Sequence, residues 1–348
     1  MTAELQTRVD TALRRAGRRP GLLVVSATDG EDTAFASRGP LPDPPCAPER
    51  AVFEIGSITK VFTSLLLAIA AERGELGVDD PLVEHLPRGT RVPMREGRPI
   101  RLVDLATHRS GLPRLPPGFL LPALRHRDDP YARLSTEDVL AALGKTRPRV
   151  AVGERFRYSN YGAGVLGIAL AHAAATDYEA LVRERITTPL GLRDTVITLS
   201  EDHRSRLAAG TKGWGGPAGL WAFPGLTGAG ALRSTAADLL TFIRAQMGTL
   251  RDLPEELAAA IRSTQLPRAV GGRLTPGMRV GLGWLLVGIG RPKVQVVMHS
   301  GGTGGYRSIA GWARDGRHGV VVLSANVRSV DGIGSKLLLD LERPSGSP

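Results

Sequence analysis

The 348-residue sequence contains a single cysteine, Cys46, in the proline-rich stretch PLPDPPCAPER. One cysteine excludes an intramolecular disulfide, and no catalytic setting is visible beside it. Aromatic residues are also few, at 5% of the chain. The net charge of +11 would suit a nucleic acid, but the arginines are scattered and aromatic stacking platforms for bases are missing. We therefore expect no nucleic-acid partner.

Long apolar runs are missing as well. The longest, around residues 61–71 and 163–171, are shorter than the roughly 18 residues that a membrane span needs, so we expect no membrane partner. The first 20 residues place Leu5, Val9 and Leu13 at helical spacing but lack the apolar segment of a secretory signal. The expectation is a soluble, cytoplasmic protein.

Lysine is rare, with five residues against forty arginines, and Lys60 is the one lysine preceded at a distance of three by a serine. Ser57 and Lys60 stand at the start of an apolar run, and residues three apart share a helix face. A serine hydroxyl needs a base to become a nucleophile. Lysine can be that base if burial or a neighbouring cation lowers its pKa. The alternative is a capping serine beside a solvated lysine.

A second polar group, in GERFRYSNYG, holds Tyr158 and Asn160 just before a predicted helix. Tyrosine can relay a proton if an ammonium group lowers its pKa, and asparagine can bind both a lysine and a substrate carbonyl. The alternative is a capping pair with a packed tyrosine. A similar Ser-x-Asn at 324–326 is interpreted as the end of a strand.

A third group follows the strand through Val297, as His299, Ser300, Gly301 and Gly302. Glycines at a strand edge let a substrate approach, and a free N–H there can stabilise an oxyanion. The alternatives are a flexible hairpin connection or a phosphate loop. The phosphate loop is disfavoured because no Lys-Ser or Lys-Thr follows the glycines.

The order of elements predicts an α+β fold. We expect a first helix, a hairpin with an Asp-Gly turn, a helix over about 58–74, and a mainly helical middle from about 76 to 265. Three strands in 293–326 and a helix over about 328–342 follow. The sequence thus predicts one domain, 1–348, with a sheet lobe (1–75 and 270–348) and a helical lobe (76–269), and a site in the cleft between them.

The three groups, in this order and at these spacings, resemble the serine β-lactamase and penicillin-recognising superfamily. The similarity is greatest to the branch of class C β-lactamases, D-alanyl-D-alanine carboxypeptidases and related esterases. The signatures Ser-x-x-Lys, Tyr-x-Asn and a Lys- or His-Thr/Ser-Gly strand correspond to Ser57–Lys60, Tyr158–Asn160 and His299–Gly301. Segments such as LATHRSGLPRLP and GAGALRSTAADLLTF extend the resemblance over about 20–326.

The resemblance implies an antiparallel sheet flanked by the terminal helices, beside a helical lobe. It also implies Ser57 as the nucleophile, Lys60 and Tyr158 as the proton-transfer pair, and Asn160 orienting lysine and substrate. The resemblance further implies that the backbone N–H groups of Ser57 and Gly302 form the oxyanion hole. His299 is expected to line the cleft opposite Tyr158. His108 is expected to be structural. The sequence lacks the GxSxG nucleophile elbow of α/β-hydrolases and the HExxH and Cys/His spacings of zinc sites, so neither of these routes is supported, and no metal or cofactor is expected.

His299 stands where β-lactamases of this branch usually carry a lysine that meets the substrate carboxylate. A histidine is only partly charged near neutral pH, which disfavours an anionic drug as substrate. The sequence favours a serine esterase or amidase acting on a small-molecule or peptide-like acyl substrate. An acyltransferase, a peptidase or β-lactamase, and a non-catalytic binding protein stay open, as does the oligomeric state. The proline-rich stretch 113–134 is predicted to line or cover the acyl pocket.

Overall fold

The computed structural model describes residues 3–148, 150–272, 277–291, 293–314 and 316–343. Within them, eight strands form one antiparallel sheet in the order β2-β1-β10-β9-β8-β7-β6-β5. These strands are β1 (Leu23–Asp29), β2 (Asp32–Arg38), β5 (Ala269–Val270), β6 (Arg279–Val280), β7 (Leu285–Ile289), β8 (Val294–Gly302), β9 (Arg307–Ala313) and β10 (His318–Ser324). Residues from both ends of the chain meet where β1 pairs with β10, with Leu23 opposite Ser324. The predicted α+β fold is confirmed.

The predicted hairpin and the three C-terminal strands are present as β1–β2 and β8–β10. Strands β5, β6 and β7 were not predicted. β5 and β6 have two residues each, too short for a pattern with a period of two, and Gly288 interrupts the alternation in β7. These three strands form because β7 pairs with β8, β6 with β7, and β5 with β6.

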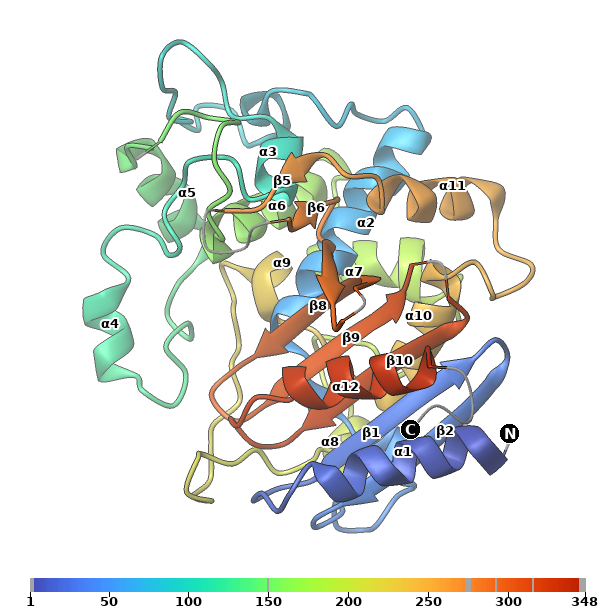
Figure 1. The fold of residues 1–348 in the computed structure, drawn as a ribbon. Coiled ribbons are helices and arrows are strands. Elements are labelled where there is room, and N and C mark those ends of the chain that lie inside the picture. Colours follow the sequence, from blue (N-terminus) through green and yellow to red (C-terminus); the bar gives the residue numbers. More distant parts are fainter. Residues whose placement is uncertain (1–2, 149, 273–276, 292, 315, 344–348) are drawn as a thin grey trace.

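One face of the sheet is covered by the two terminal helices, α1 (Ala3–Arg15) and α12 (Asp331–Leu341), which lie side by side in Figure 1. The predicted apolar stripe of α1 is buried there, against sheet residues such as Val25 and Val322. A helix with one apolar stripe gains its stability from this kind of packing. Both helices are where the resemblance placed them.

The opposite side carries the remaining helices and two short elements of sheet. The helices are α2 (Thr59–Glu72), α3 (Leu102–Ala106), α4 (Leu120–Arg125), α5 (Thr136–Lys145), α6 (Asn160–Ala173), α7 (Tyr178–Val182), α8 (Glu201–Ser205), α9 (Thr227–Gly230), α10 (Ala236–Gln246) and α11 (Glu255–Thr264). The single turns are η1 (Pro48–Arg50), η2 (Gly56–Ile58), η3 (Leu82–His85) and η4 (Arg183–Thr187), and β3 (Phe53–Glu54) pairs with β4 (Arg233–Ser234). α10 packs on β10 and β1, whereas α5 lies away from the sheet (Figure 1).

The apolar run after Lys60 forms α2, which passes through the centre of the molecule (Figure 1). Its residues from Thr59 to Ala70 are all buried, in contact with α6, α9 and α11. A helix that is apolar all round is stable only inside a core. α2 is therefore a rigid support for the residues at its N-terminal end.

No single helix in the described ranges combines the length and apolarity needed to cross a membrane. A bent pair, Asn160–Ala173 with Tyr178–Thr187, satisfies that test by length and composition when both parts are taken together.

Candidate active site

Ser57 lies in the middle of the turn η2, where the chain passes from β3 into α2. Lys60 is in the first turn of α2, and its Nζ lies 2.9 Å from Ser57 Oγ and 2.6 Å from the carbonyl oxygen of Ala229. The predicted contact between the two side chains is therefore present. Because the first N–H groups of a helix have no partner inside it, the turn also supplies backbone donors beside the hydroxyl.

Lys60 is only 2% exposed, and this burial is the main reason that its pKa is well below the ordinary value. The positive charge of Arg114 lowers it further. Both causes act in the same direction, since each disfavours the ammonium form. A neutral amine 2.9 Å from Ser57 Oγ can accept the hydroxyl proton, which is what activation of a serine requires.

Tyr158 faces the same two groups, with its ring centroid 5.1 Å from Lys60 Nζ. Burial raises the pKa of Tyr158 to about 12, although a hydrogen bond to Ser57 and the charge of Arg114 oppose the rise. The condition of a pKa lowered by an ammonium group is not met, because desolvation outweighs the hydrogen bond to Ser57 and the charge of Arg114. At neutral pH Tyr158 is a phenol that can donate a proton, not a phenolate that can accept one.

Asn160 is the first residue of α6, which is capped by Ser159 through a hydrogen bond from Gly162 N to Ser159 Oγ. Its Nδ2 donates to Tyr131 Oη at 3.3 Å, and its buried Oδ1 has no partner among the described residues. The predicted contact with Lys60 is not made, because the amine is directed to Ala229 instead. Asn160 thus presents a free acceptor, held in place by Tyr131.

The ring of His108 packs against the ring of Tyr158, with centroids 4.4 Å apart. Its Nδ1 accepts a hydrogen bond from the backbone N–H of Ser159 at 3.2 Å, and its side chain is buried. Burial and the charges of Lys60 and His299 hold its pKa well below the ordinary value. A neutral histidine here fixes the position of the Tyr158–Asn160 segment, in agreement with the predicted structural role.

His299 lies on β8 and faces Tyr158, with ring centroids 6.3 Å apart. Its Nδ1 is 2.8 Å from the carbonyl oxygen of Ser300, so Nδ1 carries the proton, because a carbonyl can only accept. Burial and the charge of Lys60 lower its pKa to about 4. The expectation of a partly charged histidine is therefore wrong, since at neutral pH His299 is uncharged and its buried Nε2 is an acceptor without a partner in the described structure.

The end of β8 passes so close to η2 that only glycine fits. A Cβ on Gly301 would lie 2.0 Å from the carbonyl oxygen of Ile55, and one on Gly56 would lie 2.6 Å from Gly302 N. Ser300, in the same part of β8, is exposed. The backbone nitrogen of Gly302 thus lies beside the turn that holds Ser57, as an oxyanion hole formed by these two residues requires.

Comparison with known proteins identifies this arrangement. A model of the family described as Beta-lactamase matches residues 6–339. The chain belongs to the beta-lactamase family. It is 32% identical to the D-alanyl-D-alanine-carboxypeptidase/endopeptidase AmpH of Escherichia coli over 286 residues, which cover 80% of this chain and 72% of AmpH. It is also 33% identical to the human putative beta-lactamase-like 1 over 261 residues, 70% of this chain and 50% of that protein.

Solved structures of this family have the same fold. A class C beta-lactamase superimposes with a TM-score of 0.82 at 20% identity, covering 99% of this chain and 98% of the other. The beta-lactamase/D-alanine carboxypeptidase from Yersinia pestis, complexed with citrate, gives a TM-score of 0.81 at 24% identity, covering 99% and 100%. Because the chain belongs to the beta-lactamase family, it is an enzyme of the serine hydrolase type, which acts through an acyl-enzyme on small-molecule or peptide-like substrates.

Two residues near this beta-lactamase-family site were not predicted from the sequence. Arg114 places its guanidinium 5.7 Å from the ring centroid of Tyr158, and Tyr131 bonds to Asn160. Both lie in the 113–134 stretch, whose proposed role in an acyl pocket depended on its length and composition alone. A lone arginine between prolines gives no signal that distinguishes it from the many surface arginines of this chain.

Tyr131 belongs to an aromatic cluster next to Asn160. Its ring contacts those of Phe119, Trp221 and Phe223, with centroids 4.9, 5.3 and 4.3 Å away. In a chain with only 5% aromatic residues, this concentration forms a rigid apolar wall. In contrast, α4 extends away from the body in Figure 1 and leaves Leu120 and Leu124 exposed by 70% and 61%. Whether α4 covers the site stays a prediction.

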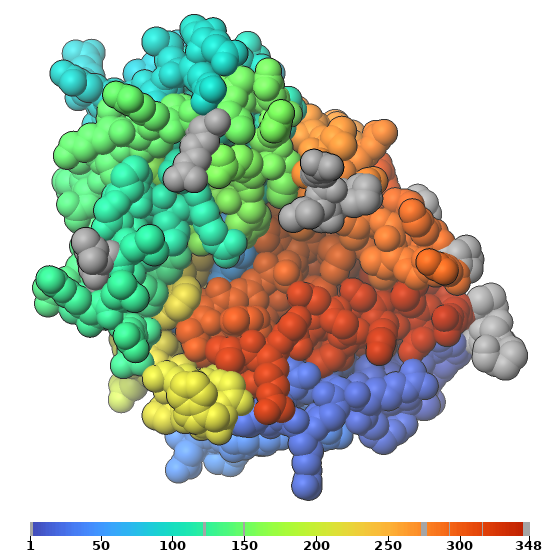
Figure 2. Space-filling model, turned by 60° about the vertical axis from the view of Figure 1, so that its left-hand side comes forward, coloured from blue at the N-terminus to red at the C-terminus, as the bar shows by residue number. Residues whose placement is uncertain are grey.

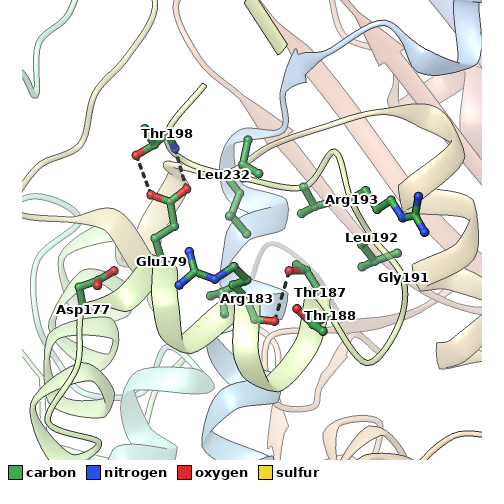
Figure 3. A pocket seen from close by; sticks show the side chains of 13 residues that line it. Asp177, Glu179, Arg183, Thr187, Thr188, Gly191, Leu192, Arg193, Thr198 and Leu232 are labelled. Atoms are coloured by element: carbon green, nitrogen blue, oxygen red, sulfur yellow. Dashed lines mark hydrogen bonds between the residues drawn. The ribbon is translucent and has the colours of Figure 1, made fainter. Parts of the chain in front are cut away.

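The space-filling view shows a hollow between the green and orange parts of the chain, with blue atoms at its floor (Figure 2). A separate pocket lies between α7, η4 and the loop that follows (Figure 3). There Glu179 accepts hydrogen bonds from Thr198, and none of the predicted catalytic residues lines the pocket. It therefore lacks the nucleophile and base that the chemistry needs.

One group in the described ranges could hold a metal by its spacing, formed by Asp194, Asp202 and His203. Arg206 already lies in it and donates to both carboxylates, at 2.7 Å to Asp194 and 2.5 Å to Asp202. The guanidinium supplies the positive charge that an ion would bring, so we interpret the cluster as a structural ion pair.

Proposed function

We propose that Ser57 is the nucleophile of a serine hydrolase that cleaves an ester or amide, with Lys60 as its base. The observation that carries this proposal is the 2.9 Å contact between Lys60 Nζ and Ser57 Oγ at a buried position. Burial and the charge of Arg114 also lower the pKa of Lys60, which favours the neutral amine that a base requires. Neither half of the pair could act alone, since an unassisted hydroxyl is a poor nucleophile.

The reaction begins when neutral Lys60 takes the proton of the Ser57 hydroxyl and Oγ attacks the substrate carbonyl carbon. The N–H groups of Ser57 and Gly302 would stabilise the oxyanion, an effect commonly worth about 3 kcal/mol for each donor. Collapse of the tetrahedral intermediate breaks the bond to the leaving group, which takes a proton from the Tyr158 hydroxyl. Tyr158 regains that proton from Lys60. Water then attacks the acyl-enzyme, with the same groups returning the proton to Ser57.

The uncharged His299 supports an ester or neutral amide as the substrate in preference to a β-lactam drug. Its free Nε2 accepts hydrogen bonds and offers no positive charge to a carboxylate on the leaving group. A panel of p-nitrophenyl esters, anilides and the cephalosporin nitrocefin tests this. We expect the esters to give a kcat/KM at least tenfold above that of nitrocefin, and the reverse order would refute the ester proposal.

A second candidate activity is release of the terminal residue from a D-Ala-D-Ala peptide. The observation that favours it is the 32% identity to AmpH over most of both chains. Adding a D-Ala-D-Ala tripeptide to the same panel separates the candidates. Release of free D-alanine faster than hydrolysis of every ester would make the peptidase activity the principal one.

A further inference from the structure

Arg114 is a permanent cation that takes part in none of the proton transfers of the proposed mechanism. Its side chain is exposed, and its Cζ lies 5.7 Å from the ring centroid of Tyr158. Its backbone carbonyl accepts the N–H of Tyr161 at 3.1 Å, which anchors the residue to the start of α6. Within the described part of the chain, the guanidinium has no ion-pair or hydrogen-bond partner.

The groups around Tyr158 do not balance this charge. Lys60 adds a second basic group 5.1 Å from the same ring, and His299 is uncharged at neutral pH. Asp129, whose charge acts on Tyr131, accepts hydrogen bonds from the backbone N–H groups of Tyr131 and Ala222. A guanidinium beside Tyr158 that forms no ion pair fits a substrate that brings its own negative charge.

The position of Arg114 relative to Tyr158 indicates which part of the substrate carries that charge. Arg114 is anchored at α6, beside Asn160, and its charge acts on Tyr131, the hydrogen-bond partner of Asn160. His299 approaches Tyr158 from a different element, the strand β8. The side with Arg114 also has the free Oδ1 of Asn160 and the aromatic wall, which together suit an acyl chain with a polar end.

We propose that Arg114 binds a carboxylate on the acyl part of the substrate, so that half-esters or half-amides of dicarboxylic acids are preferred. This inference rests on the proposed function of Ser57. A guanidinium matches a carboxylate through two parallel hydrogen bonds, which a lysine cannot form with the same geometry. Arg114 would thus determine substrate specificity by supplying a positive charge, which the uncharged His299 of the third motif does not.

Three esters of equal acyl length show whether the enzyme prefers a carboxylate on the acyl chain, a carboxylate on the leaving group, or no carboxylate. Mono-p-nitrophenyl glutarate has an anionic acyl chain, p-nitrophenyl pentanoate is neutral, and the pentanoate of 5-hydroxy-2-nitrobenzoic acid has its carboxylate on the leaving group. We expect the wild type to prefer the glutarate over the neutral ester by about tenfold or more in kcat/KM. The preference should weaken in high salt, because the guanidinium is exposed.

The variant Arg114→Gln should remove the preference, and Arg114→Lys should keep part of it. The ratio of the two p-nitrophenyl esters within one variant cancels any change in Lys60, and turnover of the neutral ester shows that the variant is folded. Arg127→Gln, an exposed arginine in the same stretch, is the matched control and should keep the wild-type ratio. The inference is overturned by a ratio near one in the wild type, by a preference for the leaving-group carboxylate, or by an unchanged ratio in Arg114→Gln. Failure to hydrolyse any of the three esters would instead overturn the proposed function.

Discussion

Gly56 should be essential for activity, because its missing side chain lets Gly302 approach the turn that holds Ser57. Gly56 has φ of 52°, and a Cβ there would lie 2.6 Å from the nitrogen and 2.9 Å from the oxygen of Gly302. Carbon atoms make favourable contacts at about 3.5 Å or more, so Gly56→Ala must displace the end of β8 by roughly 0.5–1 Å. Such a displacement separates the two proposed oxyanion donors.

Misplacing a catalytic group by about 1 Å can cost about 100-fold in rate, which is about 2.7 kcal/mol in the activation barrier. We therefore expect Gly56→Ala to lower kcat for a p-nitrophenyl ester by about 100-fold, measured by steady-state kinetics. The left-handed backbone of an alanine adds a loss of about 1 kcal/mol in the free energy of unfolding.

Gly74 provides the matched control for this backbone strain. It has φ of 67°, and a Cβ there would have no heavy atom within 4 Å, so Gly74→Ala introduces the strain without the collision. This variant should lose about 1 kcal/mol of stability and keep its kcat. If Gly56→Ala keeps kcat within a few-fold of the wild type, the close approach of Gly302 has no part in catalysis and the argument fails.

Three further predictions concern Lys60 and Tyr131. Because the pKa of Lys60 is lowered, kcat/KM for a neutral ester should rise with pH, with a midpoint below the ordinary lysine pKa of ~10.4. Arg114→Gln removes a charge that lowers this pKa, so it should move the midpoint to higher pH. An unchanged midpoint would mean that Lys60 is not the titrating base. Lys60→Met should be inactive but more stable at pH 7, since the unfolded chain binds a proton that the folded chain loses, at about 1.4 kcal/mol per unit of lowering. That gain in Tm should shrink as the pH rises towards 10, whereas the exposed Lys336→Met should show neither effect. Tyr131→Phe removes the hydrogen bond that holds Asn160 and should reduce kcat/KM about three- to tenfold, with little change in Tm; a larger loss of stability than of activity would assign Tyr131 to the core alone.

Local patterns were sufficient to predict the elements that carry the site. The spacing of Ser57 and Lys60 and the apolar run behind them predict a buried helix with both side chains on one face, which is how α2 is built. The hairpin and the three C-terminal strands follow from alternation and turns. Each of these features depends on neighbours in the sequence.

The features that could not be predicted depend on contacts between distant segments. The pKa of Tyr158 is raised mainly by burial in the folded chain, which the spacing of Tyr158 and Asn160 in the sequence does not show. Arg114 and Tyr131 reach the site only because loops from different parts of the chain meet there. The tautomer of His299 follows from the carbonyl of Ser300, whose orientation is a property of the folded strand.

Trapping of the acyl-enzyme is the most direct test of the central claim that Ser57 carries the acyl group. The protein is quenched with acid during turnover of a slowly hydrolysed p-nitrophenyl ester, digested, and analysed by peptide mass spectrometry. We predict the mass of one acyl group on the peptide that contains Ser57, and no such mass in Ser57→Ala. An acyl group on any other residue, or undiminished turnover by Ser57→Ala, would contradict the account.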